Sequence, residues 1–205
     1  GPLSVGLGVS VPAHTEAASS PSWLALICSL VANGTLFTSL VFGTFYLWLS
    51  GGDWQKMPPP EPSRLLAFGV IACLVVAAVA ARGSLRVVVA SGKTSGWMAI
   101  TALALMLAAG MIVDLIMGAT PHPRAHALGA TASVLLGYVG FHAAAGLLFL
   151  ISNFQRVRSG YISRLRCTDL RLTRLWIDYT LVTGVIALGL VLALPSLVTV
   201  LGARP

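Results

Sequence analysis

The sequence predicts an all-α integral membrane protein, a bundle of five transmembrane helices with a cytoplasmic N-terminus and a C-terminus on the outer side. The first observation is composition: 57% of the residues are hydrophobic and 9% are charged, whereas about 25% are charged in an ordinary soluble domain. The second is a series of long apolar stretches, and the third is the placement of the basic residues between them. Lipid is therefore the expected solvent for most of the chain.

The apolar stretches are long enough to cross a bilayer, since a helix needs roughly 20 apolar residues to span the hydrocarbon core. They cover residues 23–49, 65–81 with an extension toward 89, 97–117, 127–151 and 175–201. Each is predicted to be one helix. Pro195 is expected to kink the last of them, because proline removes a backbone hydrogen bond inside a helix.

The remaining segments are predicted to be connections. Residues 1–22 are rich in Gly, Pro, Ala and Ser and are interpreted as a flexible linker or tail, which leaves 23–205 as the membrane domain. The segment 50–63 contains a proline cluster and is predicted to be an exposed loop. His122 and His126 could bind metal from one helix face, but the prolines beside them favour a loop.

The basic residues set the predicted orientation. Six of the thirteen lie between the fourth and fifth apolar stretches and three more lie between the second and third, which alternate crossings place on one side. The other side carries four basic residues. Cytoplasmic loops are enriched in Lys and Arg, so the richer side is assigned to the cytoplasm.

The most basic segment follows the fourth stretch. Two interpretations stay open: its arginines contact anionic lipid or a partner subunit, or they are topology signals alone. Each Lys or Arg near an anionic leaflet contributes about 1 kcal/mol, so six could hold headgroups or an acidic surface. The residues are Arg156, Arg158, Arg164, Arg166, Arg171 and Arg174.

Polar side chains inside the apolar stretches are candidates for contacts between helices. His142, Asn33, Asp114 and Asp178 form this set. Polar residues in membrane helices mostly face other protein groups. Asp114 lies near a helix end, where it is either a solvated or hydrogen-bonded residue or a proton-relay group. Trp97 and Trp176 are interpreted as interfacial tryptophans.

Catalytic, cofactor-binding and metal-binding residues are not predicted in this chain. Haem held by two imidazoles needs two intramembrane histidines, and His142 is the only one. The three cysteines are far apart and form no metal-binding pair. Nucleic acid is not an expected partner, because the positive charge lies between apolar stretches rather than over a soluble surface.

Three segments resemble subunit III of the haem-copper cytochrome oxidases. The run GYVGFHAAAGLLFLI is followed by a basic loop and by LWIDYTLV, and VANGTLFTSLVFGTFYLWLSGGDW is similar to the first helix of five-helix members. The resemblance extends over about residues 22–194. It implies the same five-helix topology, with the N-terminus in the cytoplasm.

The chain departs from the family pattern at several positions. His142 matches the first histidine of GFHxxH, while Ala145 stands at the second. In the pattern YWHFVD, Trp176 is kept, but Ile177 and Thr180 replace the histidine and the aspartate. The intramembrane glutamate of many members is also missing, since that region reads Asn-Gly at positions 33 and 34.

The resemblance implies a divergent, non-catalytic subunit of a proton-translocating terminal oxidase in the bacterial cytoplasmic membrane, and a fusion behind subunit I is one arrangement. Subunits I and II and phospholipid would be its partners, in a hetero-oligomer of aerobic electron transport. Haem and copper would lie in the partner subunits. Two alternatives remain: an accessory membrane protein of nitric-oxide reductases, or a small multi-pass transporter.

Overall fold

The chain forms five long helices, seen in a computed structural model that describes residues 3–4, 10–11, 21–50, 64–118, 127–164 and 166–202. The helices are α1 (Pro21–Ser50), α2 (Arg64–Ser91), α3 (Gly96–Gly118), α4 (Ala127–Arg158) and α5 (Thr168–Gly202). Before them, β1 (Leu3–Ser4) pairs antiparallel with β2 (Ser10–Val11). The fold is otherwise all-α among the described residues.

All five helices are long and apolar enough to cross a membrane, which confirms the predicted multi-pass architecture. Two of them reach further than expected at the basic end: α4 continues to Arg158, and α5 begins at Thr168 rather than near residue 175. The helix also continues past Pro195 to Gly202. His122, His126 and the loop 50–63 lie outside the described residues.

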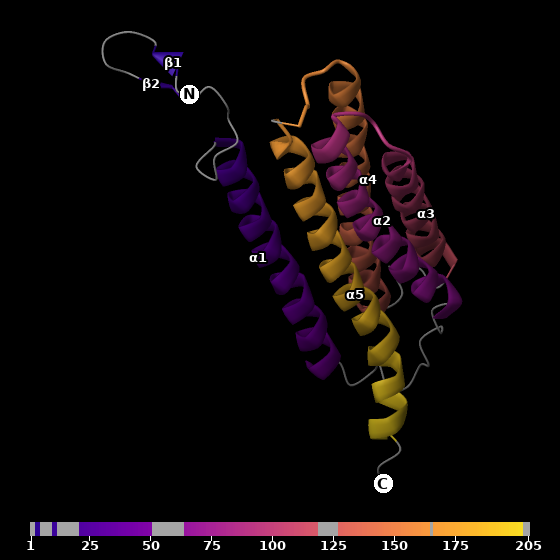
Figure 1. Cartoon of the computed structure of the whole chain (residues 1–205). Helices are drawn as coiled ribbons and strands as arrows, with labels where there is room; N and C mark the ends of the chain where they lie inside the picture. The colour runs from indigo at the N-terminus through magenta and orange to yellow at the C-terminus, as the bar shows by residue number, and fades with distance from the viewer. Residues whose placement is uncertain are drawn as a thin grey trace.

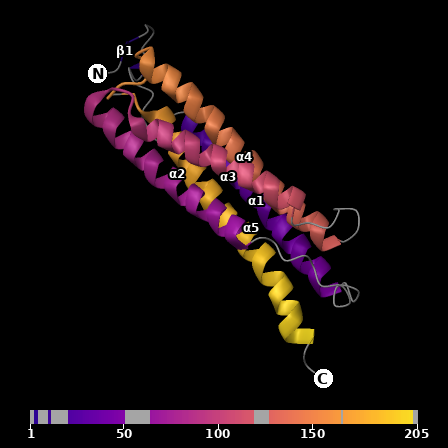
Figure 2. The same ribbon diagram turned by 90° about the vertical axis from the view of Figure 1, so that its right-hand side faces the viewer.

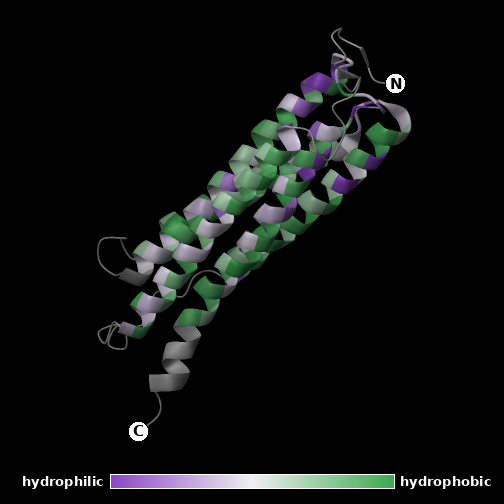
Figure 3. Cartoon of the chain, turned by 90° about the vertical axis from the view of Figure 1, so that its left-hand side faces the viewer, coloured by the Kyte–Doolittle hydropathy of each residue, from purple (hydrophilic) through white to green (hydrophobic). Residues whose placement is uncertain are grey.

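The helices run roughly along a common axis, with α2, α3, α4 and α5 side by side and α1 at the edge of the bundle (Figures 1 and 2). α1 packs against α4 and α5. The start of α1 and both short connections, α2–α3 and α4–α5, lie at one end, and the end of α5 lies at the other. Hydrophobic residues cover most of the helix length, and hydrophilic residues gather toward the first end (Figure 3).

The apolar core lies between α2, α3, α4 and α5. Leu74, Leu105, Ile112 and Leu135 are among its fully buried side chains. α1 contributes little to it, because only Phe37 and Thr44 are buried along that helix. Large apolar side chains cover the outer faces, as expected for helices that face lipid.

Glycines bring neighbouring helices close together at two points. A Cβ atom at Gly184 of α5 would lie 2.6 Å from Cδ1 of Leu74 on α2, and one at Gly83 of α2 would lie 2.8 Å from Cδ2 of Trp97 on α3. Small residues allow this approach in membrane helices. The contact holds the ring of Trp97 against α2, with 43% of that residue exposed.

Candidate functional site

His142 is the most buried polar residue of α4, with 1% of its surface exposed. Its Nδ1 lies 2.8 Å from the carbonyl oxygen of Tyr138, one turn earlier. A carbonyl can only accept, so Nδ1 carries the hydrogen and donates. The orientation of the ring is thereby fixed by its own helix.

The other ring nitrogen meets α1. Nε2 of His142 lies 3.2 Å from Oδ1 of Asn33, whose Nδ2 is 2.9 Å from the carbonyl oxygen of Ser29. With the amide in this orientation both ring nitrogens donate and the ring is an imidazolium. With the amide reversed, its NH₂ donates to Nε2 of a neutral ring. A charged ring buried without a carboxylate is costly. The reversed amide in turn places Oδ1 against the carbonyl oxygen of Ser29, where only the Ser29 hydroxyl, 3.4 Å away, can donate to it.

Trp176 of α5 covers the face of the imidazole. The two rings are stacked with their centroids 5.0 Å apart, and Nε1 of Trp176 donates to the carbonyl oxygen of His142 over 3.0 Å. Only 6% of Trp176 is exposed. Its indole points into the bundle, and its N–H is used there.

Two tyrosines complete the cluster. The hydroxyl of Tyr138 donates to the carbonyl oxygen of Asn33 over 2.9 Å and lies 2.6 Å from the hydroxyl of Tyr179. Because the Tyr138 hydrogen is used toward Asn33, Tyr179 donates to Tyr138. Sequence reasoning missed both tyrosines, although Tyr138 stands one helical turn before His142 and Tyr179 stands three residues after Trp176.

These five residues, Asn33, Tyr138, His142, Trp176 and Tyr179, are called the His142 network. They come from α1, α4 and α5. Both ring nitrogens of His142 are engaged inside the bundle, and the described residues form no group of three or more His, Cys, Asp or Glu side chains that could hold a metal ion. The network connects α1 to α4 and α5 through hydrogen bonds and ring contacts.

A second polar contact joins α2 to α5. Nη2 of Arg82 lies 2.8 Å from Oδ1 of Asp178, and Nε of Arg174 lies 3.4 Å from Oδ2 of the same carboxylate. Arg82 also donates to the carbonyl oxygen of Ala78. Asp178 is thus placed between two helices, as its sequence position suggested, and two arginines share its single negative charge.

Asp114 and Trp97 differ in their surroundings. Asp114 is exposed on α3, and no hydrogen bond or ion pair joins it to another of the described residues, so the expected interhelical contact is not formed there. Asp114 lies four residues before the end of α3. Trp97 is partly exposed and packs on Gly83.

The α4–α5 connection is an ordered structure. α4 ends in a Schellman motif, in which the N–H groups of Gly160 and Tyr161 donate to the carbonyl oxygens of Val157 and Arg156. Gly160 takes the required positive φ of 77°. A tight turn follows, closed by two backbone hydrogen bonds between Ser163 and Arg166.

Polar and apolar anchors attach this connection to the bundle. Nδ2 of Asn153 donates to Oγ1 of Thr173 over 2.7 Å and ties the end of α4 to the first turns of α5. Ile162 and Cys167 are buried. Arg164 lies against Gly92 in the α2–α3 turn. The two short connections at this end are therefore in contact.

The structure separates the six arginines into different environments. Arg156 pairs with Asp169, Arg158 lies over the ring of Phe154, and Arg174 pairs with Asp178. Arg164 covers the neighbouring turn, while Arg166 and Arg171 are exposed.

No protein-family model and no curated protein sequence matches this chain.

Proposed function

We propose that this chain is a non-catalytic, subunit III-like component of a haem-copper terminal oxidase in the bacterial cytoplasmic membrane. In this role it packs against subunit I, binds structural lipid and supports the proton-uptake side during aerobic electron transport. Haem and copper belong to the partner subunits. The chain itself supplies a membrane scaffold rather than reacting groups.

One observation supports this proposal above the others. The resemblance rests on three segments that are far apart in the sequence, and the residues that represent them meet at one point. Asn33 lies in the first-helix match, in the region where the family's glutamate is missing. His142 lies in the GFHxxH match and Trp176 in the last-helix match, and these three side chains are joined by hydrogen bonds and stacking. A chance match of isolated motifs would not require such a convergence.

The geometry also argues for a structural role of the network. His142 presents no free ring nitrogen, because Nδ1 faces the carbonyl of Tyr138 and Nε2 faces Asn33. Trp176 and Phe141 cover its ring. A group enclosed in this way holds helices together.

The non-catalytic role is tested in the intact complex with His142→Gln and His142→Ala. Glutamine keeps one hydrogen-bonding group, so the Gln variant guards against simple misfolding. We expect haem content and oxygen reduction per haem to match wild type in every complex that retains the chain. A shifted haem absorbance band in a complex with full occupancy of the chain would show that His142 acts on the cofactor and would sink the scaffold role.

A further inference from the structure

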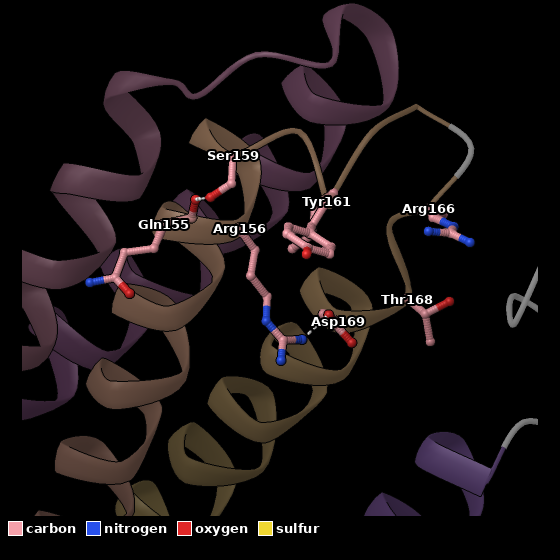
Figure 4. A pocket seen from close by; sticks show the side chains of 8 residues that line it. Gln155, Arg156, Ser159, Tyr161, Arg166, Thr168 and Asp169 are labelled. Atoms are coloured by element: carbon pink, nitrogen blue, oxygen red, sulfur yellow. Dashed lines mark hydrogen bonds and ion pairs between the residues drawn. The ribbon is translucent and has the colours of Figure 1, made fainter.

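A polar pocket opens at the α4–α5 connection, with a volume of about 500 Å³ (Figure 4). One wall comes from the last turns of α4, one from the turn after it and one from the first turn of α5. The side chains that matter here are Gln155, Arg156, Tyr161, Arg166, Thr168 and Asp169. This pocket does not include any residue of the His142 network.

Backbone hydrogen bonds fix the segments that form the walls of the pocket. The carbonyl oxygen of Arg156 accepts from the N–H groups of Tyr161 and Ile162, and Arg166 exchanges two backbone hydrogen bonds with Ser163. The buried side chain of Ile162 anchors the turn between them. Arg156 and Arg166 therefore approach the pocket from two fixed segments.

The charges in the pocket suit an anion. Nη1 of Arg156 contacts Oδ2 of Asp169 at 2.5 Å, which uses one of the five N–H groups of a guanidinium. The Arg166 side chain makes no hydrogen bond or ion pair with another described residue. Oγ1 of Thr168 is buried and has no hydrogen-bond partner among the described residues. Two arginines and one aspartate leave a net charge of +1, which a phosphodiester would neutralise.

The position of the pocket along the membrane normal is expected to match that of the lipid headgroups. The apolar part of α4 is expected to end at residue 151, and Gln155 and Arg156 follow it by four and five residues. At 1.5 Å per residue they lie about 6–8 Å beyond the hydrocarbon edge. A headgroup layer is about 5–8 Å thick on each side. Lipid phosphates would stand at the level of Arg156.

We propose that this pocket binds a singly charged phosphate group, held by the guanidinium groups of Arg156 and Arg166, while Asp169 orients Arg156 and competes with the ligand for it. The group has two sources, the phosphodiester of an anionic lipid or free inorganic phosphate. Charge-assisted hydrogen bonds from a planar guanidinium are strong and directional. The lipid source rests on the structural-lipid role in the proposed function, but the pocket uses this chain's residues alone, so its failure would leave the haem test of the oxidase assignment unaffected.

The test uses the full chain in neutral detergent micelles at physiological salt. Phosphatidylglycerol is titrated in one arm and inorganic phosphate in the other, and bound ligand is counted by native mass spectrometry. We expect Arg166→Gln and Arg156→Gln to weaken binding about tenfold each, which is the loss typical of one charge-assisted hydrogen bond. Asp169→Asn should strengthen binding, because it frees Arg156.

Matched controls remove the same charge outside the pocket. Arg158→Gln and Arg171→Gln change residues of the same segment that do not line it, and we expect less than about a twofold change in neutral micelles. Circular dichroism checks that each variant keeps its helices. Arg166→Lys retains the charge but loses the planar fork, so partial binding is expected.

The possible results distinguish the two sources of the phosphate group, and they also show whether the site exists. Saturable binding in either arm that depends on Arg156 and Arg166 supports the site and identifies the source. Equal weakening by all four glutamine variants would show unspecific attraction and overturn it. Failure of both probes to bind wild type would also overturn it.

Discussion

The indole of Trp176 stacks on the imidazole of His142 at an interplanar angle of 14° and donates its N–H to the backbone carbonyl of the same residue. One side chain of α5 thus fixes both the ring and the backbone of α4. Gly146 lies beside the indole, and a Cβ atom there would meet Cδ1 at an ordinary van der Waals distance of 3.4 Å. The stacking and the hydrogen bond bury Trp176 against α4, with 6% of its surface exposed.

The two functions of Trp176 can be separated by substitution. Trp176→Phe keeps a ring over His142 and loses the donor, so we expect a loss of about 1 kcal/mol in the free energy of unfolding. Trp176→Ala also opens a cavity and should cost about 3–5 kcal/mol. Unfolding in mixed micelles, followed by circular dichroism, measures both. Equal losses for the two variants would contradict the stacking role.

Asn33 should control the attachment of α1. Asn33→Leu removes the side-chain contact with His142, and hydrogen bonds between membrane helices contribute about 0.6 kcal/mol and up to about 1.7. We expect the free energy of unfolding to fall by an amount in this range. We also expect limited proteolysis to cleave α1 faster than in wild type. Thr35→Leu is the matched control.

Thr35 is exposed on α1, and its hydroxyl donates to the carbonyl of Val31 in the same helix. Its replacement should therefore leave the attachment of α1 unchanged. A larger effect from Thr35→Leu than from Asn33→Leu would argue that α1 is held by another face.

Close packing of α2 and α5 predicts different effects for two glycines of one helix. Gly184→Ala places a methyl group against Leu74, and overpacking of this kind costs about 1–3 kcal/mol. Gly189→Ala meets nothing within 4 Å and should be neutral or stabilising by up to about 1 kcal/mol, because alanine is the better helix former. Thermal unfolding of both variants provides the comparison, and the reverse order would show that α2 and α5 do not approach here.

Asp178 should be coupled more strongly to Arg82 than to Arg174. The first contact joins two helices at 2.8 Å, whereas the second is an i,i+4 pair at 3.4 Å within one helix. Such i,i+4 pairs contribute about 0.3–0.5 kcal/mol. Double-mutant cycles with Asp178→Asn, Arg82→Gln and Arg174→Gln measure both couplings. A coupling to Arg174 equal to or above that to Arg82 would contradict the interhelical assignment.

The main features of the fold could be predicted from the sequence, because apolar stretches of sufficient length leave few alternatives in a bilayer. The start of α5 could not be predicted from the sequence. The segment before residue 175 carries Asp169, Arg171 and Arg174 and resembles a loop in composition, yet the contact of Asn153 with Thr173 supports a helix there. Hydropathy does not detect helix that extends beyond the hydrocarbon layer.

The candidate site was predicted only in part. His142, Asn33 and Asp178 could be selected because polar residues in apolar helices are rare. Their partners could not, because only packing reveals what the polar atoms of Tyr138, Tyr179 and Arg82 contact. The same limit explains Asp114, which shares the rarity of Asp178 but faces away from the bundle. Sequence reasoning identifies unusual residues, whereas pairing depends on helix rotation.

The most direct test of the central claim is a reduced-minus-oxidised absorbance spectrum of the complex purified through a tag on this chain from its native membrane in mild detergent. The oxidase assignment predicts haem bands in constant ratio to the chain and oxygen reduction by the same preparation. Recovery of the chain alone, or with partners that carry no haem, would contradict it.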